Sequence, residues 1–414
     1  MKASILVIGS GMAGMSAALE AAEAGHDVCL VEKDASAGGR VARMHRFFPK
    51  LCPPICGLEL YFRRIRTNPR IQLLTLAQVE KVAGQRGSFQ VTLKVQPRYV
   101  RDTCTVCGEC AAVCPVERSD EFNYGMGKTK AVYLPHGMAM PMLYAIDDKA
   151  CLGEECSKCV PACRYDAIDL TMQPQTVELN VGSIVVATGW QPYDAEALEN
   201  LGFGRCGNVI SNVMMERLAA ADGPTGGRIL RPTDGQEVKS VAFVQCAGSR
   251  DENHLPYCSA VCCLASLKQA TYVREQNPDA RVSLFFMDVR APGRYEEFYR
   301  RVQKDEAVEV LYGKVARVEE DLGTGDLMVE ADSSVTGAKI RRSVNLVVLA
   351  TGMVPGNELP GADLALDAYG FASSNGRDDG IHVAGVAKRP MDVASSVRDG
   401  TAAALKAIRD LGRN

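Results

Sequence analysis

The sequence predicts an α/β protein with two parallel-sheet domains, the first of which is interrupted by a cysteine-rich insert. Three observations support this fold class. A glycine fingerprint stands near the start of the chain, between an apolar run and a helical pattern. Eight cysteines form two short runs between residues 104 and 163. Further along, short apolar runs alternate with helical patterns, as in parallel sheets with crossover helices.

The first element is the apolar run at residues 3–8, which leads into Gly9-Ser-Gly11-Met-Ala-Gly14 and then a helical pattern. This is the strand–turn–helix setting in which G-x-G-x-x-G binds a dinucleotide. A second strand is expected at residues 27–31 and is followed by Glu32. In dinucleotide-binding domains a carboxylate at this position holds a ribose hydroxyl, and we expect the same of Glu32. A tight turn without a ligand is the alternative. The expected contacts here are Gly9, Gly11, Ala13, Gly14, Glu32 and Lys33.

The insert begins after a strand pattern at residues 88–95 and carries two cysteine runs. The first run has the spacing C-x2-C-x2-C-x3-C-P, with which one loop holds a [4Fe–4S] cluster. The second run widens its first gap to C-x4-C. In two-cluster ferredoxins the fourth cysteine of each run ligates the other cluster. The expected sets are Cys104, Cys107, Cys110 with Cys163, and Cys151, Cys156, Cys159 with Cys114. Zinc is the alternative metal.

A third group of cysteines follows the strand expected at residues 240–245. A second glycine fingerprint is missing there, so a site for NAD(P) lacks its main physical basis. Four cysteines follow in the pattern C-x11-C-x3-C-C. Adjacent Cys262 and Cys263 cannot easily form a strain-free disulfide. A metal site is therefore more economical than four idle core cysteines. The set is Cys246, Cys258, Cys262 and Cys263.

Composition excludes several classes of function. The net charge is −3, so the chain lacks the excess of positive charge expected of a nucleic-acid-binding protein. No run of eighteen apolar residues is present, so we expect no membrane span. Sixteen cysteines in a chain of this size indicate a reducing compartment, the cytoplasm, rather than a disulfide-stapled secreted domain. His136, His254 and His382 are expected to be structural. The Met- and Pro-rich segment 134–143 is expected either to cover the protein or to dock a partner.

The fingerprint and later segments resemble flavoproteins with two dinucleotide-binding domains, of the thioredoxin and glutathione reductase type. Gly38-Gly39-Arg40 follows Glu32, and two strands end in Ala-Thr-Gly. Residues 380–385 resemble the strand that meets the flavin, although Val386 replaces the Asp usual in that superfamily. The resemblance implies FAD, with contacts at Gly39, Arg40, Ala187, Thr188, Gly189, Gly352, Gly385 and Asp392.

The expected division of the chain follows from the same resemblance. Three segments form the FAD-binding domain, with a ferredoxin-like insert and a central domain between them. The segments are 1–96 (FAD domain, first segment), 97–170 (insert), 171–236 (FAD domain, second segment, and connector), 237–342 (central domain) and 343–414 (FAD domain, third segment).

Five segments resemble the A subunit of heterodisulfide reductase, and the likeness covers nearly the whole chain. They are residues 244–252, 257–263, 287–291, 295–301 and 389–393. In that family the central cysteine motif holds an additional [4Fe–4S] cluster, which the resemblance implies here for the third set. The length and the single insert look like the A subunit of the quinone-interacting membrane-bound oxidoreductase of sulfate reducers.

The resemblance implies an oxidoreductase subunit with FAD and iron–sulfur clusters. It would pass electrons between the menaquinone pool and a cytoplasmic acceptor such as adenylylsulfate (APS) reductase. Implied partners are a second flavo-iron–sulfur subunit and a membrane cytochrome or iron–sulfur subunit, which would hold the chain at the inner membrane. One alternative is a heterodisulfide reductase-like role in thiol and disulfide chemistry or in flavin-based bifurcation. Another is a scaffold whose cofactors do not turn over.

Overall fold

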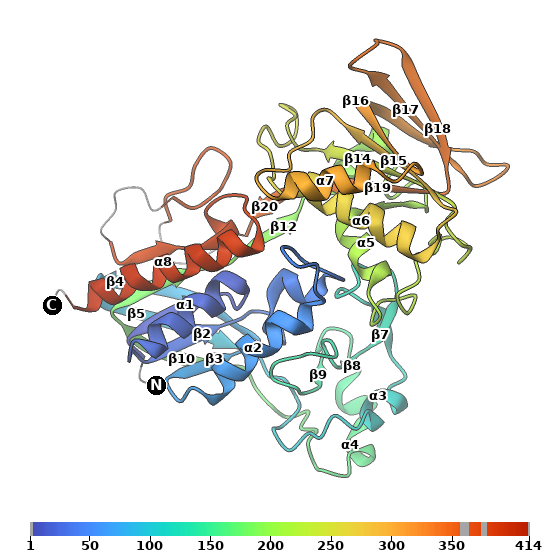
Figure 1. Ribbon diagram of the computed structural model, residues 1–414. Helices are drawn as coiled ribbons and strands as arrows, with labels where there is room; N and C mark the ends of the chain where they lie inside the picture. The colour runs from blue at the N-terminus through green and yellow to red at the C-terminus, as the bar shows by residue number, and fades with distance from the viewer. Residues whose placement is uncertain (1–2, 357–363, 374–378, 413–414) are drawn as a thin grey trace. The chain divides into compact units, whose positions relative to one another are not determined.

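The computed structural model describes residues 3–356, 364–373 and 379–412. The chain divides into two compact units (Figure 1). The first unit comprises Met1–Trp190 and Pro355–Asn414, and the second comprises Gln191–Val354. The short strands β12 (Trp190–Pro192) and β20 (Met353–Pro355) pair with each other in a separate two-stranded sheet.

The first unit is built around a parallel five-stranded sheet in the order β21-β11-β1-β2-β3. Most of its strands are short apolar runs buried on both faces, as expected of a covered parallel sheet. The strands are β1 (Ile5–Ile8), β2 (Val28–Val31), β3 (Ile71–Leu74), β11 (Ser183–Val186) and β21 (Ile381–Val383).

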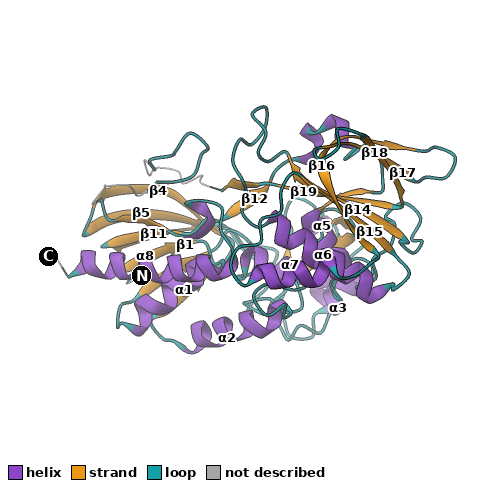
Figure 2. Ribbon diagram, turned by 45° about the horizontal axis from the view of Figure 1, so that its top comes forward, coloured by secondary structure: helices purple, strands orange, loops and turns teal. Residues whose placement is uncertain are grey.

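Helices cover one face of this sheet and a second, antiparallel sheet covers the other (Figure 2). Side chains alternate along a strand, so Ile5 and Val7 pack on the helices whereas Leu6 and Ile8 pack on the antiparallel sheet. The helices are α1 (Met12–Glu23), α2 (Pro54–Thr67) and α8 (Val393–Leu411). The antiparallel strands are β4 (Ala77–Gln85), β5 (Ser88–Val95) and β10 (Gln175–Val181), in the order β10-β5-β4.

The cysteine-rich insert lies between β5 and β10 and has little regular structure. Its own small core contains cysteines of both runs together with Val100, Val132 and Ile168. The elements are α3 (Glu109–Val113), β6 (Glu117–Ser119), β7 (Lys128–Lys130), β8 (Val132–Tyr133), β9 (Ala145–Ile146) and α4 (Cys159–Ala162). Met140 belongs to the insert but is buried in a different core, the one between the first sheet and its helices.

The second unit has a seven-stranded sheet in the order β13-β19-β14-β15-β16-β17-β18. The first five strands are parallel and the last two antiparallel. The strands are β13 (Val209–Ser211), β14 (Ser240–Ala247), β15 (Arg281–Phe286), β16 (Val308–Glu320), β17 (Leu327–Ser333), β18 (Lys339–Val344) and β19 (Leu346–Thr351). The helices α5 (Asn212–Ala219), α6 (Cys262–Gln276) and α7 (Tyr295–Gln303) pack on the parallel strands.

Two strands of this sheet fall in segments that the sequence assigned to the FAD-binding domain. β13 precedes residue 237 and β19 follows residue 342, yet they pair with each other and β19 pairs with β14. The central unit is therefore longer at both ends than the expected 237–342. Within the described ranges, none of the helices has the length and hydropathy needed to cross a bilayer.

Candidate functional site

The glycine loop, residues 9–11, joins β1 to α1 at the carboxyl end of the sheet. Gly9 has a left-handed backbone (φ +96°), and a Cβ there would overlap the carbonyl oxygen of Ala187, which directly follows the neighbouring strand β11. A Cβ on Gly14 would overlap the carbonyl oxygen of Gly9. These two glycines are thus required by packing alone.

Gly11 differs from the other two glycines of the fingerprint. A Cβ at Gly11 would meet no described atom within 4 Å, so open space lies beside it. α1 starts directly after Gly11, and no described side chain caps its N-terminus. Free backbone N–H groups at a helix N-terminus, next to open space, suit a pyrophosphate. The glycine loop therefore fits the dinucleotide moiety of FAD.

Glu32 lies beside the same loop and is buried. Its carboxylate accepts hydrogen bonds from the Ser10 backbone N–H (2.9 Å), the Ser10 hydroxyl (2.7 Å) and the Asp34 N–H (3.0 Å). Burial raises the pKa of Glu32, and the neighbouring Asp34 carboxylate raises it further. The acid expected to hold a ribose hydroxyl is thus fixed against the loop, and its role as that contact stays a prediction.

The other expected FAD contacts lie at several places. Gly39 approaches the fingerprint, since a Cβ on it would stand 2.9 Å from the Gly11 Cα. The Ala187-Thr188-Gly189 and Gly385 positions follow β11 and β21, at the carboxyl edge of the first sheet. Asp392 caps α8 by accepting from the Ser395 N–H at 2.7 Å, and Lys33 is exposed. Gly352 belongs to the second unit, where a Cβ would overlap the hydroxyl of Ser249.

Three cysteines of the first run gather around Tyr144 in the insert. Burial raises the pKa of Tyr144, and the thiols of Cys110, Cys104 and Cys107 raise it further. Burial also raises the pKa of Cys110 to about 11. Cys163 packs against the same small core, and its sulfur accepts from the Ala167 N–H at 3.3 Å.

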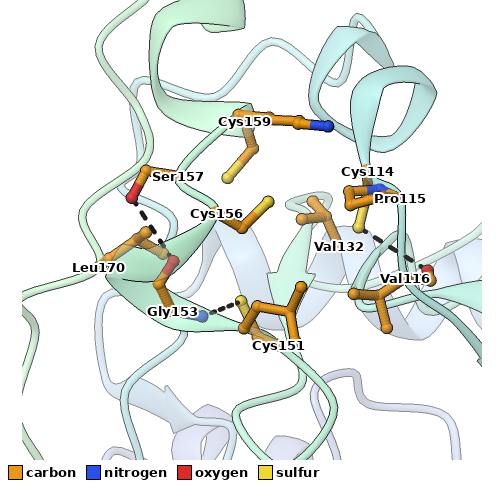
Figure 3. Close-up of a pocket in the computed structure, with 12 residues that line it drawn as sticks. Cys114, Pro115, Val116, Val132, Cys151, Gly153, Cys156, Ser157, Cys159 and Leu170 are labelled. Atoms are coloured by element: carbon orange, nitrogen blue, oxygen red, sulfur yellow. Dashed lines mark hydrogen bonds between the residues drawn. The ribbon is translucent and has the colours of Figure 1, made fainter.

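The fourth cysteine of the first run points into a pocket formed by the second run. Cys114 lines this pocket together with Cys151, Cys156 and Cys159 (Figure 3). Burial raises the pKa of Cys159, with the thiols of Cys151, Cys114 and Cys156 adding to the effect. The Gly153 N–H donates to the Cys151 sulfur at 3.4 Å. The structure thus brings together the four residues that the exchanged-ligand pattern expects, and their role as ligands stays a prediction.

The chemistry of these sites can be compared with that of a single zinc ion. A zinc site needs donors that converge on one atom, whereas a cubane cluster keeps its four thiolates further apart. No three His, Cys, Asp or Glu side chains in the described ranges converge in the way a single ion requires. The number and spacing of the thiols suit clusters.

The central cysteine set lies where a second glycine fingerprint would stand. β14 ends at Ala247 and α6 begins at Cys262, and residues 248–261 form a long connection that we call the cysteine loop. Cys262 and Cys263 occupy the first turn of α6, where the helix dipole favours anions such as thiolates.

The four thiols of the central set lie close enough to influence one another. Burial raises the pKa of Cys262, and the thiols of Cys246, Cys263 and Cys258 add to the effect. Burial likewise raises the pKa of Cys263 to about 11. Buried neighbouring thiols remain protonated unless a cation compensates their charge, which a metal centre does. The set therefore fits an iron–sulfur cluster by its donors.

An ion pair connects this loop to the end of the next strand. The guanidinium of Arg250 contacts the carboxylate of Asp288, two residues after β15. The thiol of Cys263 donates to the Asp288 carbonyl oxygen at 3.8 Å. The Arg250 side chain also hydrogen-bonds Cys246, which opposes the effect of burial on the pKa of that thiol. Asp288 thus supports the cysteine loop.

The three histidines of interest have partners of their own. His382 Nε2 lies 2.7 Å from the buried Asp410 carboxylate, and His254 Nδ1 lies 2.8 Å from the Tyr193 hydroxyl. His136 Nε2 lies 3.2 Å from the Ser36 hydroxyl. All three are thus engaged in polar contacts, as structural histidines are.

Several known proteins are similar to this chain in sequence. A family model described as an FAD binding domain matches residues 4–43, which include the glycine loop and Glu32. The second iron–sulfur A subunit of the CoB–CoM heterodisulfide reductase of Methanopyrus kandleri is 40% identical over 98% of this chain and 64% of its own length. The corresponding A subunit of Methanocaldococcus jannaschii is 38% identical over 97% of this chain and 63% of its own.

The chain is similar to heterodisulfide reductase A subunits over nearly its whole length. A third relative is the A subunit of the H2:CoB–CoM heterodisulfide,ferredoxin reductase of Methanothermobacter marburgensis, 37% identical over 97% of this chain and 63% of its own. This heterodisulfide reductase-like chain thus spans slightly less than two thirds of the length of these relatives. Each of these three relatives matches 97–98% of the chain, so the matched region extends over the segments that contain the cysteine runs.

Solved structures confirm the fold class of this heterodisulfide reductase-like chain. Thioredoxin reductase of T. acidophilum matches with a TM-score of 0.55 and 14% identity over 99% of this chain and 98% of its own. Thioredoxin reductase of Lactococcus lactis matches with a TM-score of 0.56 and 14% identity over the whole of both chains. Similarity at this identity shows the two-domain flavoprotein fold alone, and the ferredoxin-like character of the insert rests on its cysteines.

Sequence reasoning missed several residues that build the sites. Ser10 donates twice to Glu32, and Asp288 supports the central set. Asp288 carried a usable signal, since an acid at the end of the second strand of a Rossmann-like unit is the counterpart of Glu32. Tyr124 and Trp190 contact Arg40. Trp190 could have been noticed, because it is the single tryptophan of the chain and directly follows Ala-Thr-Gly. No sequence pattern indicated a role for Tyr124.

Proposed function

We propose that the chain is a flavo-iron–sulfur electron-transfer subunit of an oxidoreductase complex. The observation that carries this proposal is the pocket in which Cys114 joins Cys151, Cys156 and Cys159, within the same compact unit as the glycine loop. When bound, FAD exchanges electrons in pairs and clusters exchange them singly. A chain that holds both can connect a two-electron partner to one-electron carriers.

The residues of the chain have separate tasks in this proposal. The glycine loop and Glu32 hold the dinucleotide moiety of FAD. The insert holds two [4Fe–4S] clusters through its exchanged cysteine sets, and the central set holds a third. Backbone N–H donors to sulfur, such as those of Gly153 and Ala167, stabilise thiolate charge and so shift the cluster potentials.

We further propose that the complex is linked to quinone. In this version electrons pass between the menaquinone pool and a cytoplasmic acceptor such as APS reductase. The partners are a second flavo-iron–sulfur subunit and a membrane cytochrome or iron–sulfur subunit, and the chain is held at the inner membrane through them. The resemblance to the quinone-interacting oxidoreductase of sulfate reducers supports this version.

A second candidate is membership of a heterodisulfide reductase complex that acts in thiol and disulfide chemistry or in electron bifurcation. The names of the relatives favour it, because those of M. kandleri and M. marburgensis are heterodisulfide reductase subunits. Co-purification separates the two candidates. The quinone-linked version predicts that a tagged chain recovers a haem-containing membrane subunit. The second predicts recovery of a partner that reduces disulfides.

The cofactor proposal is tested by analysis of protein purified without oxygen. We expect one FAD and about three clusters, that is about twelve iron and twelve acid-labile sulfide, per chain. About eight iron would mean that the central set holds no cluster. Iron-free protein with readily alkylated thiols would contradict the proposal as a whole.

A further inference from the structure

The segment between the two cysteine runs packs on the glycine-loop side of the first unit. The Ala37 N–H donates to the Met140 carbonyl at 2.9 Å, and the Met140 N–H donates to the Ser36 hydroxyl at 2.9 Å. One residue further on, the Gly38 N–H donates to the Ser10 carbonyl at 3.0 Å. Residues 36–38 are therefore hydrogen-bonded to the insert on one side and to the glycine loop on the other.

A row of stacked side chains crosses the same boundary. From the insert come His136, Phe122 and Tyr124, and from the flavin-binding segments come Arg43, Arg40 and Trp190. The rings of His136 and Phe122 stack with centroids 5.0 Å apart and an angle of 18° between their planes. We call the six residues together the aromatic–guanidinium stack.

Each arginine of the stack lies over two aromatic rings. The Arg43 Cζ is 5.2 Å from the Phe122 ring and 5.5 Å from the Tyr124 ring. The Arg40 Cζ is 5.9 Å from the Tyr124 ring and 5.4 Å from the Trp190 ring. All four distances fall within the reach of cation–π attraction. The stack thus alternates rings and cations from the insert to the flavin-binding segments.

Hydrogen bonds also orient the guanidinium groups of Arg40 and Arg43. Arg40 donates to the Trp190 carbonyl at 3.1 Å and to the Tyr124 hydroxyl at 3.0 Å. Arg43 donates to the Glu121 carbonyl at 3.0 Å. Tyr124 has a left-handed backbone (φ +53°), which is unfavourable for a bulky residue unless its contacts compensate. Tyr124 is therefore held in place by the two arginines.

Both arginines stand on the short helix η1 (Gly39–Arg43), whose first residue approaches Gly11. We propose that Arg40 and Arg43 are positioning residues that hold the cluster-bearing insert against the flavin-binding fingerprint. Because η1 lies against the glycine loop, loss of the stack loosens the dinucleotide site as well as the insert. The inference rests on the proposed function only in taking FAD and clusters as the groups held on the two sides.

The inference has a functional consequence for electron transfer. The rate of electron tunnelling falls steeply with distance, and small displacements of a site have large effects on its reaction. A stack that fixes the insert on η1 keeps the separation between the flavin site and the insert clusters constant. The two arginines would thus matter for transfer although they ligate no cluster.

The test uses the full-length protein with its cofactors, purified without oxygen. Tyr124→Leu removes the shared ring from the insert side, and Arg43→Met removes one cation from the other side. Both are expected to raise hydrogen exchange in residues 36–44 and the rate of FAD loss on dilution by about tenfold, while iron content is unchanged. Tyr124→Phe keeps the ring, and Arg43→Lys keeps the charge. Both variants should therefore be close to the wild type in hydrogen exchange and in the rate of FAD loss.

Two controls decide the outcome. Arg66→Met removes an exposed arginine of α2 and should change neither exchange nor FAD loss. The double variant should be less affected than the product of the single effects, because both substitutions remove the same contact. Tyr124→Leu and Arg43→Met that both behave like Arg66→Met would overturn the inference. If the wild-type protein holds no FAD, the proposed function fails, and exchange in residues 36–44 still tests the stack by itself.

Discussion

The two units place different chemistry at the same position of a similar βαβ arrangement. In the first, β1 passes to α1 through the three-residue glycine loop, and an acid, Glu32, follows the next strand. In the second, β14 passes to α6 through the cysteine loop, and an acid, Asp288, follows the next strand. Each loop ends at a helix N-terminus, which favours negative charge.

In the proposed function, this one scaffold position would serve a different ligand in each unit. A pyrophosphate needs backbone N–H groups and room, which a short glycine turn provides. A cluster needs several thiolates that converge from different directions, which a longer loop and the first helical turn provide together. The acid changes its role accordingly: Glu32 accepts hydrogen bonds from the glycine loop, whereas Asp288 is paired with Arg250.

The largest expected effect comes from a ligand of the cysteine loop. Cys262→Ala should lower the iron content from about twelve to about eight per chain, because a cluster that loses a buried thiolate is not retained. The insert clusters and FAD should remain. Iron and acid-labile sulfide analysis measures the change, with Cys206→Ala, a buried cysteine outside the set, as the control. Equal iron content in the two variants would mean that the cysteine loop holds no cluster.

The glycine loop should respond to a distinct pair of substitutions. Gly14→Ala overlaps the Gly9 carbonyl, so it should destabilise the protein by about 3 kcal/mol whether or not FAD is present. Gly11→Ala meets no protein atom, so the stability of the FAD-free protein should change by less than about 1 kcal/mol while FAD binding is lost.

Urea unfolding and FAD titration of the two variants distinguish these effects. Gly137→Ala is the matched control, because a Cβ there meets nothing within 4 Å. Unaltered FAD binding by Gly11→Ala would show that the open space beside this residue is not the pyrophosphate site.

Glu32 gives the glycine-loop side a pH dependence in the FAD-free protein. Burial raises its pKa in the folded chain above the unfolded value of about 4.3, so the folded state binds the proton more tightly. Its contribution to stability should therefore be greatest below about pH 4 and fall as pH rises through the folded pKa, by at most about 1.4 kcal/mol per pH unit. Urea unfolding over this range measures the slope. Glu32→Gln should remove this contribution from the slope, and Glu59→Gln, at an exposed position of α2, should leave the slope unchanged.

Much of the fold could be predicted because its signals are local. The strands expected at residues 3–8, 27–31, 88–95 and 240–245 occur in these places as β1, β2, β5 and β14. The exchange of the fourth cysteines was also expected, and Cys114 does lie among the second run. Ligand spacing within a loop is a local property of the chain, so it can be read from the sequence.

Contacts between distant segments could not be predicted in the same way. Nothing local indicates that Met140 is buried in the core of the first sheet or that Tyr124 lies between two arginines. The second unit also extends beyond the expected residues 237–342. At its N-terminal end this is because β13 is a three-residue strand whose place is set by pairing with β19. Gly352 was expected at the flavin, and its position beside Ser249 depends on the path of the cysteine loop.

The smallest expected effect concerns the acid of the second unit. Asp288 contacts Arg250 and Arg290, and its side chain is half exposed, so Asp288→Asn should cost less than about 1 kcal/mol and leave iron content unchanged. Urea unfolding at low and high salt measures the loss, which should shrink in high salt, with Asp279→Asn at an exposed site as the control. The Cys263 thiol contacts the backbone of Asp288 and not its carboxylate, so the substitution leaves that contact in place. Release of iron from Asp288→Asn would instead mean that the carboxylate supports the cluster through Arg250, and that the two acids are equally important to their loops.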